Sequence, residues 1–248
     1  MSSAQPIAPA PVVLVTGSTR GIGAAIVTAL DARGARVIGH GSSARAGAIG
    51  ADLADPGAPQ ALWTAALDAA EEFGERRIDV LVNNAGLFSA NPIAGSDIAW
   101  LDGWEDTLRI NLTAAAQLSR FAVKAWLEDG RGGRLVNVAS RAAYRGDSPD
   151  HWHYAAAKAG MVAMTKTIAR GYAGQGVLAY AICPGFTDTA MAGDYLSSRG
   201  GPGLLADIPL GRVALPAEIA TIAVFCALDA PPSMTGAVID ANGASFVR

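Results

Sequence analysis

The chain has 248 residues, 51% of them hydrophobic, and a formal net charge of −3 at pH 7. It has no basic run of the kind that binds nucleic acid, and no uninterrupted apolar stretch reaches the roughly 18–20 residues of a membrane-spanning helix. The two cysteines, Cys183 and Cys226, do not form a CxxC pair. We therefore expect no structural zinc and no redox dithiol, but two buried thiols in a reducing, cytoplasmic compartment.

Residues 1–11 are rich in proline and alanine and lack the basic start and apolar core of a signal peptide, so we expect a short disordered tail. The pattern then predicts a β-branched strand over 12–15 and a helix over 23–33 that ends at Gly34. A strand over 36–38 and a helix over 55–73 follow. Next come a strand over 80–82 and a long helix over about 104–127.

The second half continues this alternation. The predicted elements are a strand over 134–138, a long helix over 154–173, a strand over 178–182, a helix over 216–228 and a last strand over 237–239. Strands separated by helices indicate βαβ units in a mostly parallel sheet. The sequence therefore predicts one α/β domain over 12–248, a Rossmann-type doubly wound sheet with helices on both faces. Ligands of such sheets bind beyond the carboxyl ends of the strands.

A glycine-rich turn follows the first predicted strand, with the spacing G-x-x-x-G-x-G over Gly17, Ser18, Thr19, Arg20, Gly21, Ile22 and Gly23. Such a turn lets the backbone approach a pyrophosphate, whose negative charge the N-terminus of the next helix favours. Close packing of the helix against the strand would explain the same glycines. Similarly, the segment Asn84, Ala85 and Gly86 is either an ordinary turn or a floor of small residues under an adenosine ribose.

Tyr154 and Lys158 lie four residues apart on a predicted helix and therefore share one face. A phenol titrates near pH 10 and is a poor base at neutral pH, but a neighbouring ammonium stabilises the phenolate and lowers its pKa. We expect the pair to transfer protons more readily for that reason. Ser140, at the end of the preceding strand, is either a turn residue or a hydrogen-bond donor to the reacting oxygen.

From about residue 12 to the C-terminus the sequence resembles the classical short-chain dehydrogenase/reductase family, nearest in pattern to 3-oxoacyl-carrier-protein reductases. The matching pieces are the glycine turn, 83–86, Asn111, Ser140, Tyr154 with Lys158, and Pro184-Gly185. Each piece is modest alone, but their order and spacing together are specific.

The resemblance implies a role for each matching residue. Tyr154 would be the general acid in reduction and the base in oxidation, with Lys158 assisting it and binding the nicotinamide ribose. Ser140 would position the substrate oxygen, and Asn111 would hold a water that connects Lys158 to solvent. Further cofactor contacts would come from Asp52 and Leu53 at the adenine and from Pro184, Gly185, Thr187 and Thr189 at the nicotinamide.

The end of the second predicted strand decides the choice of cofactor. Members that bind NAD generally carry an acidic residue there, which contacts the ribose hydroxyls and would repel a 2′-phosphate. Here residues 39–43 contain no carboxylate, while Arg20, Ser42 and Ser43, and more weakly Arg45, are candidate phosphate ligands. The sequence therefore predicts NADP(H) rather than NAD(H).

Two segments depart from the family pattern or vary within it. Residues 141–153, one residue longer than usual, are expected to form part of the rim of the substrate cleft. Their two histidines, His151 and His153, are expected to be solvated rather than to bind a metal. The family's substrate lid would occupy about 190–209, where glycines suit a segment that closes over a ligand.

The predicted function is an NADP(H)-dependent oxidoreductase that interconverts a carbonyl and a secondary alcohol, either a 3-oxoacyl reductase or a ketone/alcohol dehydrogenase. The resemblance also implies a homotetramer built through the two long helices. A non-catalytic NADP(H)-binding sensor or scaffold on the same fold is the alternative, and an extended-branch epimerase or dehydratase is a weaker one, because little chain follows Pro184.

Overall fold

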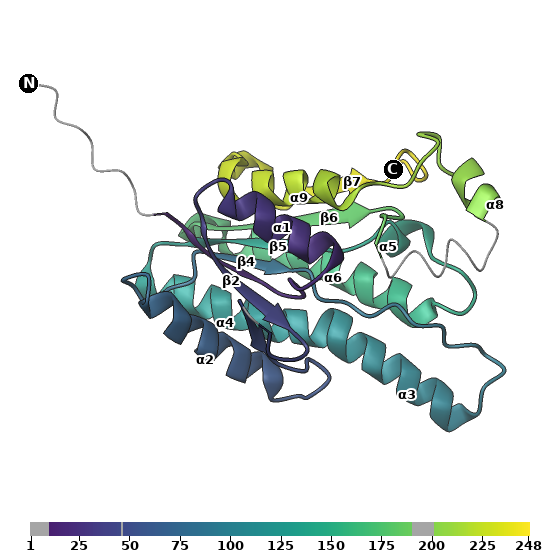
Figure 1. Ribbon diagram of the computed structural model, residues 1–248, viewed down its shortest axis with the longest axis horizontal. Coiled ribbons are helices and arrows are strands. Elements are labelled where there is room, and N and C mark those ends of the chain that lie inside the picture. Colours follow the sequence, from purple (N-terminus) through teal and green to yellow (C-terminus); the bar gives the residue numbers. More distant parts are fainter. Residues whose placement is uncertain (1–9, 46, 190–200) are drawn as a thin grey trace, which may run out of the picture.

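The computed structural model describes residues 10–45, 47–189 and 201–248. Its centre is a seven-stranded sheet in the order β3-β2-β1-β4-β5-β6-β7, with every adjacent pair parallel (Figure 1). The strands are β1 (Val12–Val15), β2 (Arg36–Gly41), β3 (Ala48–Gly50), β4 (Val80–Asn83), β5 (Gly133–Val138), β6 (Val177–Pro184) and β7 (Val238–Ala241). This architecture confirms the predicted single doubly wound α/β domain.

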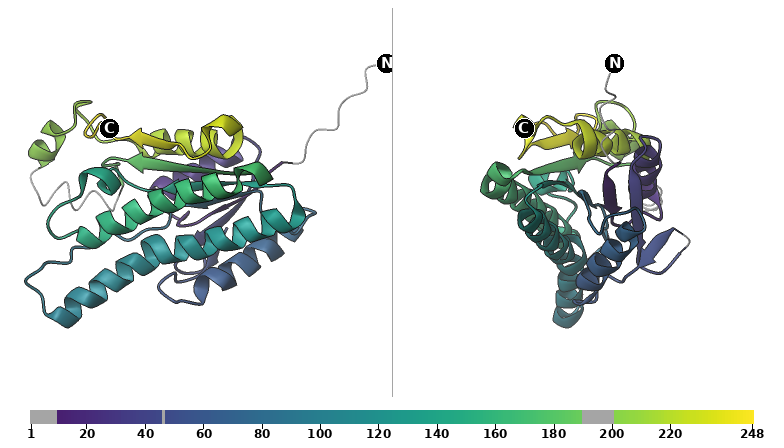
Figure 2. Two further views of the ribbon diagram at one scale, coloured as in Figure 1. Left: turned by 180° about the vertical axis from the view of Figure 1, so that it is seen from behind. Right: turned by 90° about the vertical axis from the view of Figure 1, so that its left-hand side faces the viewer.

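Helices cover both faces of the sheet (Figures 1 and 2). They are α1 (Gly21–Asp31), α2 (Ala58–Glu71), α3 (Asp97–Leu108), α4 (Ala114–Asp129), α5 (Ala142–Arg145), α6 (Trp152–Tyr172), α8 (Gly201–Ala206) and α9 (Pro216–Val224). Helices α1 and α9 pack on one face, and α2, α4 and α6 on the other. Within the described ranges, no helix has the length and apolar character needed to cross a bilayer.

Strand β1 shows why the predicted strands are apolar at every position. Successive side chains of a strand point to opposite faces of the sheet. Val13 and Val15 accordingly pack with α1 and α9, whereas Val12 and Leu14 pack with α2 and α4. All four residues are buried, as expected for a central strand of a parallel sheet.

The sequence analysis missed one strand and misplaced several helix boundaries. The missed strand, β3, has three residues at the edge of the sheet, too few for a periodic signal. The first long helix begins at Asp97, capped by Ser96, and a wider π-helical turn, Arg109–Thr113, separates α3 from α4. Likewise α9 continues as a π-helical turn, Phe225–Asp229. A π turn adds one residue without breaking the run of helical residues, so residue patterns do not reveal it.

Two predicted segments lie partly outside the described residues: positions 1–9 of the tail predicted over 1–11, and positions 190–200 of the lid predicted over about 190–209. The later part of the predicted lid contains α8, and Asp207, just after that helix, forms an ion pair with Arg145 at 2.8 Å. Both cysteines are buried and free, as the sequence predicted.

A chain of buried polar side chains crosses the core between β4, β5 and the helices beside them. Asn83 Nδ2 donates hydrogen bonds to Asn137 Oδ1 at 2.9 Å and to Ser119 Oγ at 3.0 Å. Asn137 Nδ2 in turn donates to Thr165 Oγ1 at 2.8 Å. Each member is under 3% exposed, so the loss of one leaves its partners without water to replace it.

We predict that Asn137→Ala lowers the free energy of unfolding by about 2–3 kcal/mol, because it removes two buried hydrogen bonds, to Asn83 and to Thr165, that water does not replace. Urea denaturation followed by circular dichroism measures this change. The matched control is Thr167→Ala, which removes an exposed hydroxyl bonded within helix α6 and should cost less than about 0.5 kcal/mol. Equal losses for the two variants would contradict the importance of the buried chain.

Candidate active site

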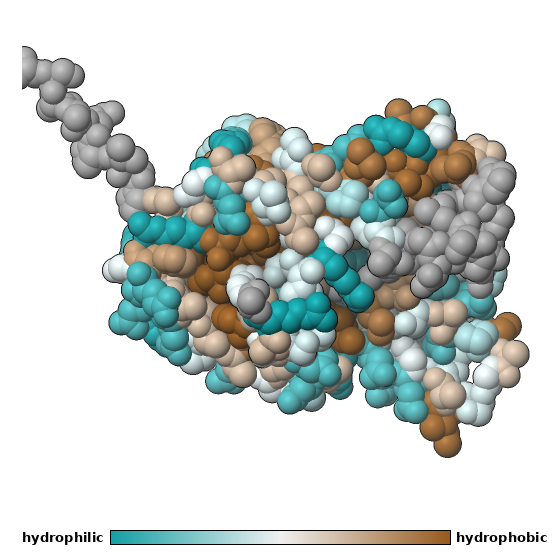
Figure 3. All heavy atoms as spheres, viewed as in Figure 1, coloured by the Kyte–Doolittle hydropathy of each residue, from teal (hydrophilic) through white to brown (hydrophobic). Residues whose placement is uncertain are grey.

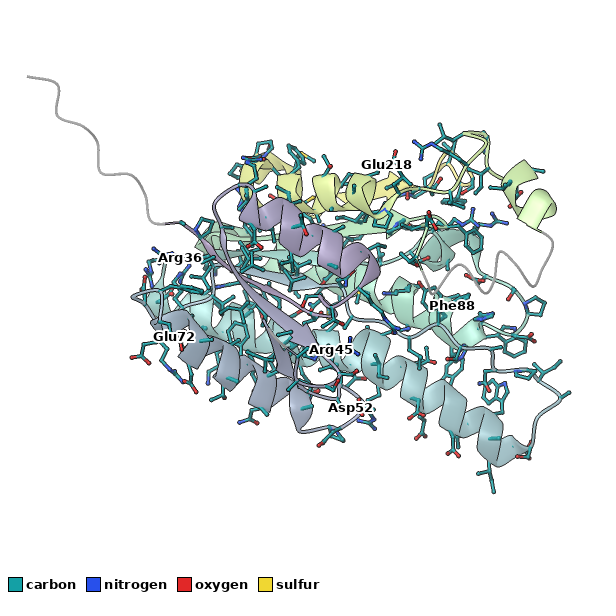
Figure 4. All side chains as sticks on the ribbon, in the orientation of Figure 1. Arg36, Arg45, Asp52, Glu72, Phe88 and Glu218 are labelled. Carbon is teal, nitrogen blue, oxygen red and sulfur yellow. The ribbon has the colours of Figure 1, made fainter. Side chains whose placement is uncertain are left out.

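The carboxyl ends of the strands meet at a cleft of about 480 Å³. It lies where the strand order reverses between β1 and β4, the position at which doubly wound sheets bind ligands. The predicted site residues that line it are Gly17, Thr19, Arg20, Gly21, Ile22, Gly23, Ser42, Ser43, Asp52, Leu53, Asn84, Ala85, Gly86, Ser140, Tyr154, Lys158, Pro184, Gly185, Thr187 and Thr189. Arg45 and Asp52 mark one end of the cleft and Phe88 the other (Figure 4).

The glycine turn has no room for side chains. A Cβ on Gly17 would lie 2.8 Å from Ala85 Cα, and one on Gly23 would lie 2.0 Å from the Gly17 carbonyl oxygen. Gly17 also has a φ of +64°, a backbone region that other residues rarely adopt. Close packing and a backbone open to a ligand are therefore properties of the same turn.

Asn84 and Thr16 hold the glycine turn against the end of β4. Asn84 Nδ2 donates to the carbonyl oxygens of Thr16 and Gly17, each at 3.0 Å. Thr16 Oγ1 accepts hydrogen bonds from the amides of Asn84 and Ala85, also at 3.0 Å. The Asn84 side chain therefore shapes the cleft floor by fixing the backbone on both sides of the switch point.

His40 is a cleft residue that the sequence analysis missed. The imidazole is 2% exposed, accepts a hydrogen bond from the Gly17 amide through Nδ1 at 3.2 Å, and bonds the Ala51 carbonyl through Nε2 at 2.9 Å. Ser18, predicted at the cofactor, lies behind the cleft wall, where its hydroxyl bonds the His40 backbone. The sequence signal that could have identified it is the position of His40 between Gly39 and Gly41, at the end of a predicted strand.

Ser140, Tyr154 and Lys158 come together at the middle of the cleft. Lys158 is buried, and its Nζ donates to the Val138 carbonyl at 2.8 Å and lies 5.8 Å from the centre of the Tyr154 ring. Ser140 follows β5, and its hydroxyl accepts a hydrogen bond from the Ala142 amide at 3.1 Å. The end of β5 thus positions both the serine and the lysine beside the tyrosine.

The protonation of this pair differs from the sequence-based expectation. Desolvation raises the pKa of Tyr154 to about 12, and its hydrogen bond with Ser140 opposes that rise. Desolvation also lowers the pKa of Lys158 to about 8. The expectation that Lys158 brings the pKa of Tyr154 below its ordinary value was wrong, because burial is the largest influence on this pKa and only the hydrogen bond with Ser140 opposes it. At neutral pH the phenol keeps its proton and is equipped to donate it.

Asn111 lies behind the cleft wall on the π turn between α3 and α4. The side chain is fully buried; its Oδ1 accepts from the Leu87 amide at 2.6 Å and its Nδ2 donates to the Leu87 carbonyl at 2.8 Å. A Cβ on Gly86 would lie 3.2 Å from Asn111 Oδ1 and 3.7 Å from Lys158 Nζ. Asn111 therefore holds the segment after β4 close to Lys158.

The far end of the cleft is lined by Phe88, Arg141, Asp147 and Phe186. Arg141 and Asp147 belong to the segment predicted as a cleft rim, whereas the two phenylalanines carried no sequence signal. Phe88 stacks edge-on against the Tyr154 ring at 4.8 Å, and the Arg141 guanidinium lies 4.7 Å over the Phe186 ring. This end therefore combines two charges with two aromatic rings.

The two histidines of that segment are buried and not solvated, contrary to expectation. His151 stacks on Phe88 with ring centres 4.0 Å apart and bonds the Ser148 hydroxyl at 2.6 Å. Among the described residues, no group of three or more histidine, cysteine, aspartate and glutamate side chains is placed to hold a metal ion. The histidines therefore support the tyrosine side of the cleft by packing.

Comparison with known proteins identifies the class. Residues 11–199 match the family described as short chain dehydrogenase. The chain therefore belongs to the short-chain dehydrogenase family, as its motifs predicted.

Individual relatives match along nearly the whole chain. It is 34% identical over 245 residues to a 3-oxoacyl-[acyl-carrier-protein] reductase of Haemophilus influenzae, with 95% of this chain and 98% of that protein covered. It is 37% identical over 249 residues to a D-threitol dehydrogenase of Mycolicibacterium smegmatis, with 96% and 93% covered.

Two solved structures of dehydrogenases are similar to this chain along nearly its whole length. A candidate NAD(P)-dependent gluconate 5-dehydrogenase of Beutenbergia cavernae, with NADP bound at low occupancy, has a TM-score of 0.84 and 32% identity over 95% of this chain and 96% of that one. A candidate 2-deoxy-D-gluconate 3-dehydrogenase of Agrobacterium tumefaciens with bound NADP has a TM-score of 0.83 and 30% identity, covering 96% and 97%.

The buried imidazole of His40 makes the stability of the fold depend on pH. Burial lowers the pKa of His40 below its ordinary value of 6.5, so protonation favours the unfolded chain. Its contribution to stability is complete above that value and is lost as the pH falls below it. We predict that the free energy of unfolding drops between about pH 7.5 and about pH 5.5, and drops less in His40→Gln.

Urea denaturation at the two pH values tests this. His153, whose pKa burial also lowers, contributes in the same direction, so His40→Gln should remove only part of the dependence. A pH dependence unchanged by His40→Gln would mean that the imidazole is not the titrating group.

Proposed function

We propose that this protein is an NADP(H)-dependent oxidoreductase that interconverts a carbonyl and a secondary alcohol. The observation that carries the proposal is one cleft with a glycine turn at one end and the cluster of Ser140, Tyr154 and Lys158 in its middle. The turn suits a pyrophosphate, and the cluster suits proton transfer to a reacting oxygen. The carbonyl reductase, polyol dehydrogenase and sugar-acid dehydrogenases among its relatives support this class.

The bound nicotinamide supplies or accepts the hydride. In reduction, Tyr154 donates its phenol proton to the carbonyl oxygen as that oxygen gains negative charge, and Ser140 hydrogen-bonds the same oxygen. In oxidation, Tyr154 takes the alcohol proton, so this direction is favoured by higher pH. Lys158, held by the Val138 carbonyl, stabilises the phenolate and binds the nicotinamide ribose. Asn111 keeps Gly86 and Lys158 adjacent and holds the water that links Lys158 to solvent.

The cofactor contacts follow the cleft from end to end. Beside the glycine turn, Arg20, Ser42 and Ser43 would bind the 2′-phosphate, with Arg45 next to them in the cleft lining. The turn itself would bind the pyrophosphate. Asp52 and Leu53 would bind the adenine, Asn84, Ala85 and Gly86 would lie under the adenosine ribose, and Pro184, Gly185, Thr187 and Thr189 would bind the carboxamide; all of them line the cleft. Strand β2 ends in glycine and presents no carboxylate to a phosphate, which favours NADP(H).

We also propose a cytoplasmic homotetramer with 12–248 as its folded domain and 190–209 as a substrate lid. Ile98 and Leu101 on α3 are at least half exposed, and a small hydrophobic spot among polar residues is visible at the outer tip of this helix (Figure 3). A contact with another copy would cover these side chains. The non-catalytic sensor is disfavoured because it requires no buried lysine beside a tyrosine and a serine.

We predict that Tyr154→Phe lowers kcat for NADPH-linked carbonyl reduction about 10³-fold, because a positioned general acid typically contributes 10²–10⁴-fold. Absorbance at the NADPH band measures turnover, and fluorescence titration should show NADPH binding within about twofold of the unmodified protein. Tyr172→Phe, the same change at the other end of helix α6, is the control and should leave both quantities unaltered. Retained turnover in Tyr154→Phe would refute the assignment of the proton donor.

We predict that Arg20→Ala raises the Kd for NADPH about tenfold and the Kd for NADH less than about twofold, because a charge-assisted hydrogen bond contributes about 1.5–3 kcal/mol. Fluorescence titration with each cofactor measures the two constants. Arg170→Ala, at an exposed position near the end of helix α6, is the control. Equal weakening of NADPH and NADH would contradict a role for Arg20 at the 2′-phosphate.

A further inference from the structure

An acidic side chain projects from the segment between α5 and α6 into the half of the cleft that faces the substrate. Asp147 lines the cleft together with Ser140 and Tyr154. Gly146, with a φ of +77°, turns the chain immediately before it. Three residues later the Asp150 carbonyl accepts a hydrogen bond from the Asn91 amide at 2.8 Å, which ties the segment to the chain that follows β4. The backbone on both sides therefore places Asp147 at the cleft.

The Asp147 carboxylate has hydrogen-bonding capacity to offer a ligand. Its Oδ1 accepts from the Ser148 amide at 2.7 Å, and the residue is exposed. Across the described ranges, no arginine, lysine or histidine forms an ion pair with it. An ionised carboxylate only accepts hydrogen bonds, with about four sites on two oxygens. It therefore selects groups that donate, and it repels groups that only accept.

We propose that Asp147 binds a hydroxyl group on the carbon next to the reacting carbon, so that the substrates are small polyhydroxylated carbonyls and alcohols. The inference rests on the proposed function, because Tyr154 and Ser140 are taken to hold the reacting oxygen. A hydroxyl one carbon away is then the substrate group closest to the part of the cleft lining that Asp147 supplies.

The same geometry disfavours the other substrate class considered, 3-oxoacyl thioesters. Beside its reacting carbonyl such a substrate presents a thioester oxygen, which only accepts hydrogen bonds, and an alkyl chain. The oxygen would be repelled by Asp147, and the chain would remove water from the exposed Asp147 carboxylate without replacing its hydrogen bonds. A hydroxylated substrate replaces that water with a charge-assisted hydrogen bond.

Asp147 also acts on the proton donor through its charge. The titratable groups near the Tyr154 phenol are Lys158 on the same helix, Cys183 on β6 and Asp147, and Ser140 bonds the phenol directly. Burial is the largest cause of the raised pKa of Tyr154, and Asp147 and Cys183 raise it further, because a nearby negative charge disfavours the phenolate. Removal of this carboxylate should therefore lower the pKa of Tyr154, which a purely structural role of the residue would not do.

The test compares 3-hydroxy-2-butanone with 2-butanone, which differ by one hydroxyl beside the carbonyl, in NADPH-linked reduction by the full-length protein. We expect kcat/KM to be at least about tenfold higher for the hydroxyketone, and Asp147→Asn and Asp147→Ala to reduce that ratio about tenfold when both substrates are compared at one pH. Asp150→Asn, the same change in the same segment outside the cleft lining, should leave the ratio intact. The pH profile of 2-butanone reduction should move to lower pH in Asp147→Asn.

Three results would each contradict a different part of the proposal. A ratio that Asp147→Asn and Asp147→Ala leave unchanged would overturn the role of Asp147 while the proposed function stands. Efficient reduction of an acetoacetyl thioester, improved by Asp147→Asn but with no preference for the hydroxyketone, would overturn the substrate class. No NADPH-linked turnover of any of these carbonyls, despite NADPH binding, would refute the proposed function itself.

Discussion

The hydrogen bonds between Thr16, Gly17 and Asn84 are the constraint on which the site depends. They cross from β1 to β4, where the chain reverses the direction in which strands are added to the sheet. At that point no crossover helix covers the strand ends, so backbone groups there need partners from the loops. By supplying them, Asn84 and Thr16 keep the glycine turn open and at one fixed distance from the cleft floor. His40 does the same from β2 by bonding Gly17 and Ala51.

The chemistry of the cleft arises from burial as much as from charge. Helix α6 places Tyr154 and Lys158 one turn apart, but the end of β5 determines what surrounds them, because Val138 receives the Lys158 ammonium and Ser140 bonds the phenol. Loss of water raises the pKa of Tyr154 and lowers that of Lys158, and both changes favour the neutral forms. In the proposed mechanism this burial keeps the proton on the Tyr154 phenol until it is donated.

The two halves of the cleft differ in how they are built. The cofactor half consists of backbone, glycines and short polar side chains, and its shape follows from the sheet. The substrate half consists of side chains on the segment between β5 and α6, braced by the stacking of His151 on Phe88. Because that segment lies outside the sheet, a change in its side chains need not disturb the strands, and in the proposed function substrate choice is separated from cofactor binding. In this chain the segment between β5 and α6 contributes the charged residues Arg141 and Asp147 to the cleft lining.

The sequence by itself determined the architecture and predicted the residues proposed to transfer protons. Continuous apolar runs separated by helical periods specify a parallel sheet, and motifs such as Tyr154 with Lys158 depend on spacing within one helix. What only the tertiary structure decided involves residues distant in the chain. His40 bonds both Gly17 and Ala51 across strands, Phe88 stacks directly on His151, and the π turn places Asn111 against Leu87. The direction of the Tyr154 pKa shift was likewise hidden, because desolvation is set by every neighbour of a group and not by the spacing of two residues.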